Sequence, residues 1–83
     1  MSRSGNSLDV FESLTNREEE VLAALGEGKT SKEVALLLAL SPATVSAHRR
    51  ALCRKLRAHS TAELIRIATV FRVFKRDQQM RLR

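Results

Sequence analysis

The sequence predicts an all-α domain of four helices that contains a helix-turn-helix. Threonine or serine followed three residues later by glutamate, a pattern typical of helix starts, recurs along the chain. Apolar residues follow each such start with the spacing of one helical face. Only Ala39 and Leu40 separate the second expected helix from the third, and so short a connection forces a sharp corner between them.

The first helix is expected to begin just after Thr15. Glu18 completes a capping box with that threonine, because its carboxylate can reach back to the Thr15 backbone N–H. Gly26 and Gly28 should end the helix, since glycine tolerates the left-handed turn that follows a helix C-terminus.

The second and third helices are expected to form the helix-turn-helix. A capping box over residues 30–33 opens a short second helix. Ala39 stands in the corner where a glycine would be comfortable, so we expect backbone strain there. Ser41 should cap the third helix, with Pro42 at its first position, where the missing N–H costs nothing. This helix is expected to run to about Arg57.

The two ends of the chain differ in character from its middle. A capping box over residues 60–63 opens a fourth helix, expected over residues 61–74. Residues 1–13 are small and polar, and we expect a flexible leader there. The helix-turn-helix domain would then span residues 14–74. A basic tail covers residues 75–83, which would extend the fourth helix, touch DNA or remain disordered.

Composition indicates a small basic domain with an acidic partner. The chain has 83 residues and a net charge of +6, a balance that most often points to nucleic acid. Its only aromatic residues are three Phe, which argues against stacking of single-stranded bases on rings. No apolar run is long enough to span a bilayer, and a single Cys suits a reducing compartment. We therefore expect a cytoplasmic domain with no membrane partner.

The reactive side chains do not form the pattern of an enzyme. His48 and His59 have no carboxylate at useful spacing, and Cys53 stands apart from any other metal ligand. We expect no metal and no cofactor. Cys53 borders the core on a helical wheel, where it would act as a small apolar filler. The glutamates at 18–20 are expected to be a solvated helix start, and contact with RNA polymerase is the alternative for them.

The third helix has one apolar face and one basic face. Val45, Leu52 and Leu56 fall within about 40° of one another on a helical wheel and should face the core. Small residues near the helix start would let the opposite face approach base edges, and Arg50 could then bind a guanine through two hydrogen bonds. Thr44 and the free N–H groups of the first turn suit a phosphate. That opposite face consists of Ser46, Ala47, Arg50, Arg54 and Arg57, and it is shaped to enter the major groove of double-stranded DNA.

Several short stretches together carry the motif pattern of a known family: LTNREEEVL (14–22), GKTSKEVALLLALS (28–41), TVSAH (44–48), KL (55–56) and AEL (62–64). In them the chain resembles the LuxR-type (GerE-type) helix-turn-helix domain, over residues 14–68. The family often has Asn where Ser31 stands here, and Lys or Glu where Ser46 stands. A serine reads bases less strictly, so the target sequence does not follow from the resemblance.

The resemblance implies a bacterial transcription regulator acting at the nucleoid, whose third helix enters the major groove and whose domains form a homodimer on DNA through the fourth helix. Carried over by position, the base contacts are Ser46, Ala47 and Arg50. The DNA backbone contacts are Lys32, Thr44, His48, Arg54 and Lys55. The expected dimer face consists of residues that recur every four positions on the outer side of the fourth helix: Ile65, Thr69 and Val73.

Other interpretations remain open at the level of sequence. Region four of RNA polymerase sigma factors shares the helix-turn-helix and a similar arginine-rich run. A protein-interaction module that sequesters another regulator would use the apolar surplus of the fourth helix. The stripe of Ile65, Thr69 and Val73 could instead pack beneath the leader, around Leu8, Val10 and Phe11.

Overall fold

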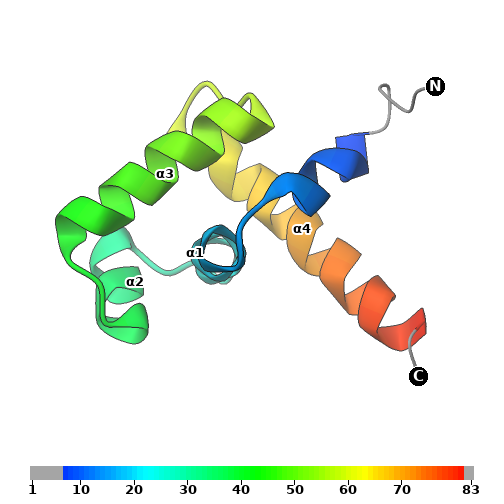
Figure 1. Cartoon of the computed structure of the whole chain (residues 1–83), viewed down its shortest axis with the longest axis horizontal. Helices are drawn as coiled ribbons and strands as arrows, with labels where there is room; N and C mark the ends of the chain where they lie inside the picture. Colours follow the sequence, from blue (N-terminus) through cyan, green and yellow to red (C-terminus); the bar gives the residue numbers. More distant parts are fainter. Residues whose placement is uncertain (1–6, 82–83) are drawn as a thin grey trace.

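The computed structural model describes residues 7–81, and the side chains of residues 10–80. A short 3₁₀ helix precedes four α-helices, and no strand occurs in the described range. The predicted all-α fold with four α-helices is confirmed. The elements are η1 (Ser7–Ser13), α1 (Asn16–Gly26), α2 (Ser31–Leu38), α3 (Pro42–Leu56) and α4 (Thr61–Arg81) (Figure 1).

Helices α1 and α2 begin at the predicted capping boxes. Thr15 Oγ1 accepts a hydrogen bond from the Glu18 N–H at 3.1 Å, and Glu18 Oε1 accepts one from the Thr15 N–H at 3.0 Å. Thr30 and Glu33 repeat the reciprocal pair at the start of α2, with distances of 3.1 and 2.8 Å. Each box satisfies backbone donors that have no partner inside the helix, so both helix starts are set locally by sequence.

The corner between α2 and α3 is tight and strained, as predicted. Ala39 lies in the left-handed region, with φ 57° and ψ 45°. The next N–H, from Leu40, donates to the Ala35 carbonyl at 2.9 Å and closes the turn. Ser41 then caps α3, and Pro42 occupies its first turn. The chain therefore changes direction sharply between α2 and α3 (Figure 1).

Helix α1 lies at the centre of the domain, between α3 and α4 (Figure 1). Its apolar face and the inner faces of the other helices form one core, in which each buried aliphatic side chain contributes about 1.5–3 kcal/mol. The buried residues are Phe11, Leu14, Val21, Leu22, Ala24, Leu25, Val34, Ala35, Val45, Leu52, Leu56, Leu64, Ala68 and Phe71.

Helix α1 ends at Gly26, as predicted, but only Gly28 adopts the left-handed conformation expected of the two glycines. Gly28 has φ +92° and makes the left-handed turn. Gly26 belongs to α1 itself. A Cβ at Gly26 would lie 2.8 Å from the carbonyl oxygen of Ala68 and 2.9 Å from Arg72 Cδ. The missing side chain therefore lets α1 approach α4 closely.

The expectation of a flexible leader over residues 1–13 is wrong for residues 7–13; residues 1–6 lie outside the described range. Ser7–Ser13 forms a 3₁₀ helix, and Phe11 is only 3% exposed. The Phe11 ring packs edge-on against Phe71, with centroids 5.1 Å apart, and against Phe74 at 5.3 Å. Packing of the Phe11 ring against two other rings orders this segment despite its polar composition, so the folded domain begins before Leu14.

Helix α4 is longer than predicted. Ser60 caps its start as expected, because Ser60 Oγ accepts a hydrogen bond from the Glu63 N–H at 3.1 Å. The second half of the predicted capping box differs, since the Glu63 carboxylate accepts from the His59 N–H instead of the Ser60 N–H. It continues to Arg81 instead of ending at residue 74, so the described part of the basic tail is helical. An ion pair between Lys75 Nζ and Glu19 Oε1, at 3.6 Å, joins the extension to α1. No described helix has the length and apolarity needed to cross a membrane.

Candidate nucleic-acid interface

Helix α3 presents its predicted outer face to solvent because its inner face is anchored in the core. Val45 and Leu52 are fully buried and Leu56 is 8% exposed. On the opposite side Ala47 and Arg50 are exposed, and Ser46, at the edge of that face, is half-buried. The structure therefore places the three predicted base-contacting residues on one surface of α3. Its sequence, PATVSAHRRALCRKL, contains no acidic residue.

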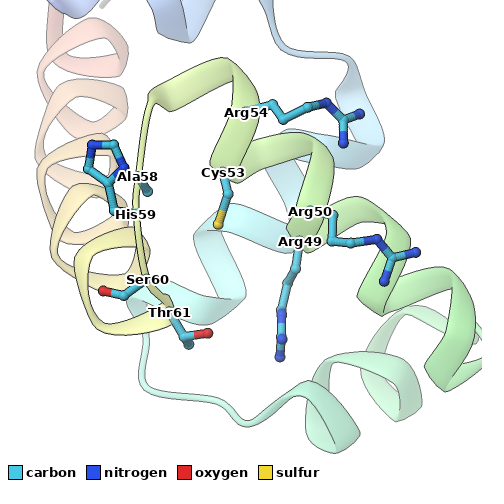
Figure 2. A pocket seen from close by; sticks show the side chains of 8 residues that line it. All are labelled: Arg49, Arg50, Cys53, Arg54, Ala58, His59, Ser60 and Thr61. Atoms are coloured by element: carbon cyan, nitrogen blue, oxygen red, sulfur yellow. The ribbon is translucent and has the colours of Figure 1, made fainter.

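The predicted backbone contacts are spread over the outer face and both flanks of α3. Arg54 is exposed and extends to the same side as Arg50 (Figure 2). His48 and Thr44 are half-buried on one flank, where Thr44 Oγ1 lies 2.8 Å from Ser41 Oγ. Lys32 is exposed in the first turn of α2.

Lys55 does not join this group, and the structure gives it another role. Its Nζ lies 2.8 Å from Glu18 Oε1 and 3.5 Å from the carbonyl oxygen of Ser13. The side chain thus faces α1 and the end of η1. Burial raises the pKa of Glu18, but hydrogen bonds from Lys55 and Thr15 and the charge of Lys55 outweigh it and lower that pKa overall. The ammonium is held in an intramolecular pair, so the expected phosphate contact is not supported.

Arg49 is a residue that the sequence analysis missed. It is half-buried, and its Nη1 donates a hydrogen bond to Ser31 Oγ at the start of α2. The bond ties the middle of α3 to the N-terminus of α2. A wheel of α3 places Arg49 near the core side, which hid it among residues expected to pack. Its neighbour Arg50 points to a different side of α3, the side to which Arg54 extends (Figure 2).

The predicted pairing face of α4 is solvent-exposed. Ile65 is 37% exposed and Val73 is 63% exposed, with Thr69 exposed between them. Thr69 Oγ1 donates to the Ile65 carbonyl within the helix, at 3.2 Å. The alternative that this stripe packs beneath the leader is wrong for Phe11, whose ring packs on Phe71 and Phe74 instead. Leu8 lies outside the described side chains.

No group of three or more His, Cys, Asp or Glu side chains that could hold a metal ion occurs within the described part of the chain. Cys53 is half-buried at the edge of the core, where the sequence placed it. The chemistry available on α3 is therefore that of a basic surface, with guanidinium groups, small side chains and a capped helix start.

Comparison with known proteins agrees with this arrangement. Residues 12–68 match the luxR family of bacterial regulatory proteins. The chain belongs to this family. The helices α2 and α3 are the DNA-binding helix-turn-helix of a luxR-family protein, and the family resemblance read from the sequence is confirmed. The match decides against the sigma-factor alternative.

Two of three named relatives of this luxR-family chain carry the name of a response regulator. It is 51% identical over 55 residues to an uncharacterised response regulatory protein, YgeK, of Escherichia coli (strain K12), covering 66% of this chain and 37% of the relative. It is 40% identical over 57 residues to the response regulator protein TodT of Pseudomonas putida, covering 69% and 25%. It is 48% identical over 52 residues to the Fimbriae Z protein of Salmonella typhimurium, covering 63% and 25%.

The chain thus spans about a quarter to a little over a third of the length of these relatives. The similarity covers about two thirds of this chain and leaves most of the length of each relative unmatched. No solved structure matches the chain.

Proposed function

We propose that this chain binds double-stranded DNA in a sequence-specific manner as part of a bacterial transcription regulator, with α3 in the major groove. The observation that carries the proposal is the outer face of α3, where Arg50 and Arg54 extend to one side and no acidic residue intervenes (Figure 2). The major groove admits an α-helix, and each base pair there shows a distinct pattern of donors and acceptors. The regulators named among the relatives support the same conclusion.

Within this proposal, each part of the face has a separate task. Ser46 and Ala47 have small side chains, so the first half of α3 can approach the base edges closely. Arg50 reaches further and binds a guanine through two hydrogen bonds. Lys32, Thr44, His48 and Arg54 contact phosphates and fix the register without reading sequence; that list includes every predicted backbone contact except Lys55.

We further propose that two copies pair on DNA through α4. Ile65 and Val73 are large apolar side chains left exposed on one side of a helix whose other side is buried. Val70 and Met80, which are 50% and 67% exposed, extend the apolar surface of α4 beyond the predicted stripe. The patch is smaller than a standard interface, so pairing is expected on DNA with two half-sites about one turn apart.

An interaction module that sequesters another regulator is the second candidate function. Leu36 and Leu37 favour it, because they are 78% and 58% exposed on α2, and exposed leucines side by side suit contact with protein. A mobility-shift assay on promoter DNA, with copurified proteins identified, distinguishes the two. A shifted band without a protein partner supports DNA binding, and a stoichiometric regulator partner with no shift supports sequestration.

Salt dependence of binding tests the proposed function directly. If a dimer neutralises roughly six phosphates, log affinity should fall against log salt concentration with a slope near −5. Fluorescence anisotropy of labelled duplex DNA over a range of potassium chloride concentrations measures this slope. A flat response would contradict DNA binding as the function of this surface.

A further inference from the structure

A basic hollow of about 400 Å³ lies beside α3, on the flank that faces the start of α4. Figure 2 shows Arg49 and Cys53 extending into the space between α3 and the residues Ser60 and Thr61. None of the lining side chains is acidic. They are Arg49, Arg50, Cys53, Arg54, Ala58, His59, Ser60 and Thr61.

The arginines of the hollow carry charge that the protein does not neutralise. Within the described part of the chain, no carboxylate forms an ion pair with Arg49, Arg50 or Arg54. Arg49 uses one of its guanidinium donors on Ser31 Oγ, and its remaining N–H groups are available. Guanidinium groups that have no acidic partner among the described residues attract an anion to the hollow.

The start of α4 closes the other side of the hollow. Ser60 caps the helix by accepting from the Glu63 N–H, and the Glu63 carboxylate accepts from the His59 N–H. That carboxylate therefore completes the cap instead of pairing with an arginine. The N–H group of Thr61, which lines the hollow and is the first residue of α4, has no acceptor inside the helix.

The apolar floor of the hollow favours a nucleic-acid backbone over a free inorganic anion. Cys53 and Ala58 line it with apolar surface and are half-buried. A free inorganic anion gains nothing from such a floor, whereas a nucleic-acid backbone alternates charged phosphate with an apolar sugar face. The hollow adjoins Arg50 and Arg54, which extend from the outer face of α3, so a strand bordering the groove occupied by α3 would pass it.

We propose that this hollow binds the sugar–phosphate backbone of one DNA strand, with Arg49 and Thr61 as contact residues. This inference rests on the proposed function. Thr44 and His48, on the opposite flank of α3, then follow the other strand. The strand at the hollow is thereby held by α3 and the start of α4 together.

A pair of matched variants tests the proposal. Thr61→Asp and Ala62→Asp each place one carboxylate in the first turn of α4, where the helix dipole favours negative charge, so both should fold. Only Thr61 lines the hollow. Affinity for a random-sequence duplex, measured at several salt concentrations, avoids any dependence on the target site. Circular dichroism confirms that both variants remain helical.

Thr61→Asp should bind random duplex DNA roughly tenfold more weakly at low salt, with a salt slope about 0.9 shallower. Ala62→Asp should stay within about threefold of the wild type, and Thr61→Lys should bind more tightly. Equal weakening by the two aspartates would overturn the proposal, because net charge alone would explain it. Unchanged binding by Thr61→Asp would overturn it while the proposed function stands. If wild-type protein shows no salt-dependent binding, both fail.

Discussion

Lys55 on α3 and Glu18 on α1 form an ion pair of 2.8 Å, in which the carboxylate is 8% exposed and the lysine side chain 37% exposed. The same carboxylate oxygen accepts the Thr15 N–H of the capping box, and Lys55 also reaches the Ser13 carbonyl oxygen. The pair thus joins the start of α1, the end of η1 and the last turn of α3. The pair holds the end of α3 against α1 and η1.

Glu18→Gln is expected to destabilise the domain by about 1–2 kcal/mol at neutral pH, because it removes a charge-assisted hydrogen bond. The folded-state pKa of Glu18 is lowered, so its contribution is fully present above the ordinary glutamate pKa. It is lost as pH falls through the lowered value. Denaturant unfolding from pH 7 to pH 3 should therefore show the gap between wild type and variant closing at the acid end.

The exposed Glu20, which pairs with Arg17 on the surface of α1 at 3.0 Å, supplies the control. Glu20→Gln should change stability by less than about 0.5 kcal/mol at either pH, as surface pairs do. A Glu18→Gln gap that stays constant from pH 7 to pH 3 would contradict the assigned role of the ion pair.

Ala39→Gly is expected to stabilise the helix-turn-helix corner. A left-handed conformation costs an L-residue about 1–2 kcal/mol, and the greater freedom of glycine in the unfolded chain offsets part of the gain. A net increase of about 0.5–1 kcal/mol in the free energy of unfolding should result. Ala47→Gly, at an exposed position in the interior of α3, should lower stability by about 1 kcal/mol. Equal losses in the two variants would show that the corner at Ala39 carries no strain.

Ile65→Glu is expected to remove pairing without unfolding the domain, because the side chain is already more than one third exposed. Binding to one half-site should persist, and cooperative binding to two half-sites should be lost. The ratio of two-site to one-site affinity cancels the effect of the new charge on each single domain. Val73→Glu should behave in the same way. Intact cooperativity in both variants would mean that α4 is not the pairing face.

The sequence predicted most of the fold because its helix starts are local signals. Thr15 with Glu18 and Thr30 with Glu33 form their boxes from neighbours in the chain, and the left-handed corner at Ala39 follows from the short connection alone. The burial of Phe11 was missed, since it depends on rings contributed by α4, distant in sequence. The polar residues around it read as a linker.

The orientation of a side chain in the candidate site was predictable where its position on the helix determines it. It was not predictable where the side chain bonds to a residue of another helix. Arg50 points outward because Val45 and Leu52 point inward, and a helical wheel shows this directly. The sequence predicts that Lys55 is a free basic side chain, but in the structure it forms an ion pair with Glu18 on α1. Arg49 was overlooked because a helical wheel places it near the core side of α3, whereas its partner, Ser31, lies on another helix.

The comparison of wild-type and Arg50→Ala affinities for a selected site and for random DNA tests the central claim most directly. The site is first obtained by selection of bound duplexes from a random library. Arg50→Ala should then lose about 1–3 kcal/mol on that site and little on random DNA, because a bidentate base contact is removed. Lys32→Ala should weaken both alike. If Arg50→Ala leaves the preference for the selected site unchanged, the outer face of α3 is not what reads the sequence.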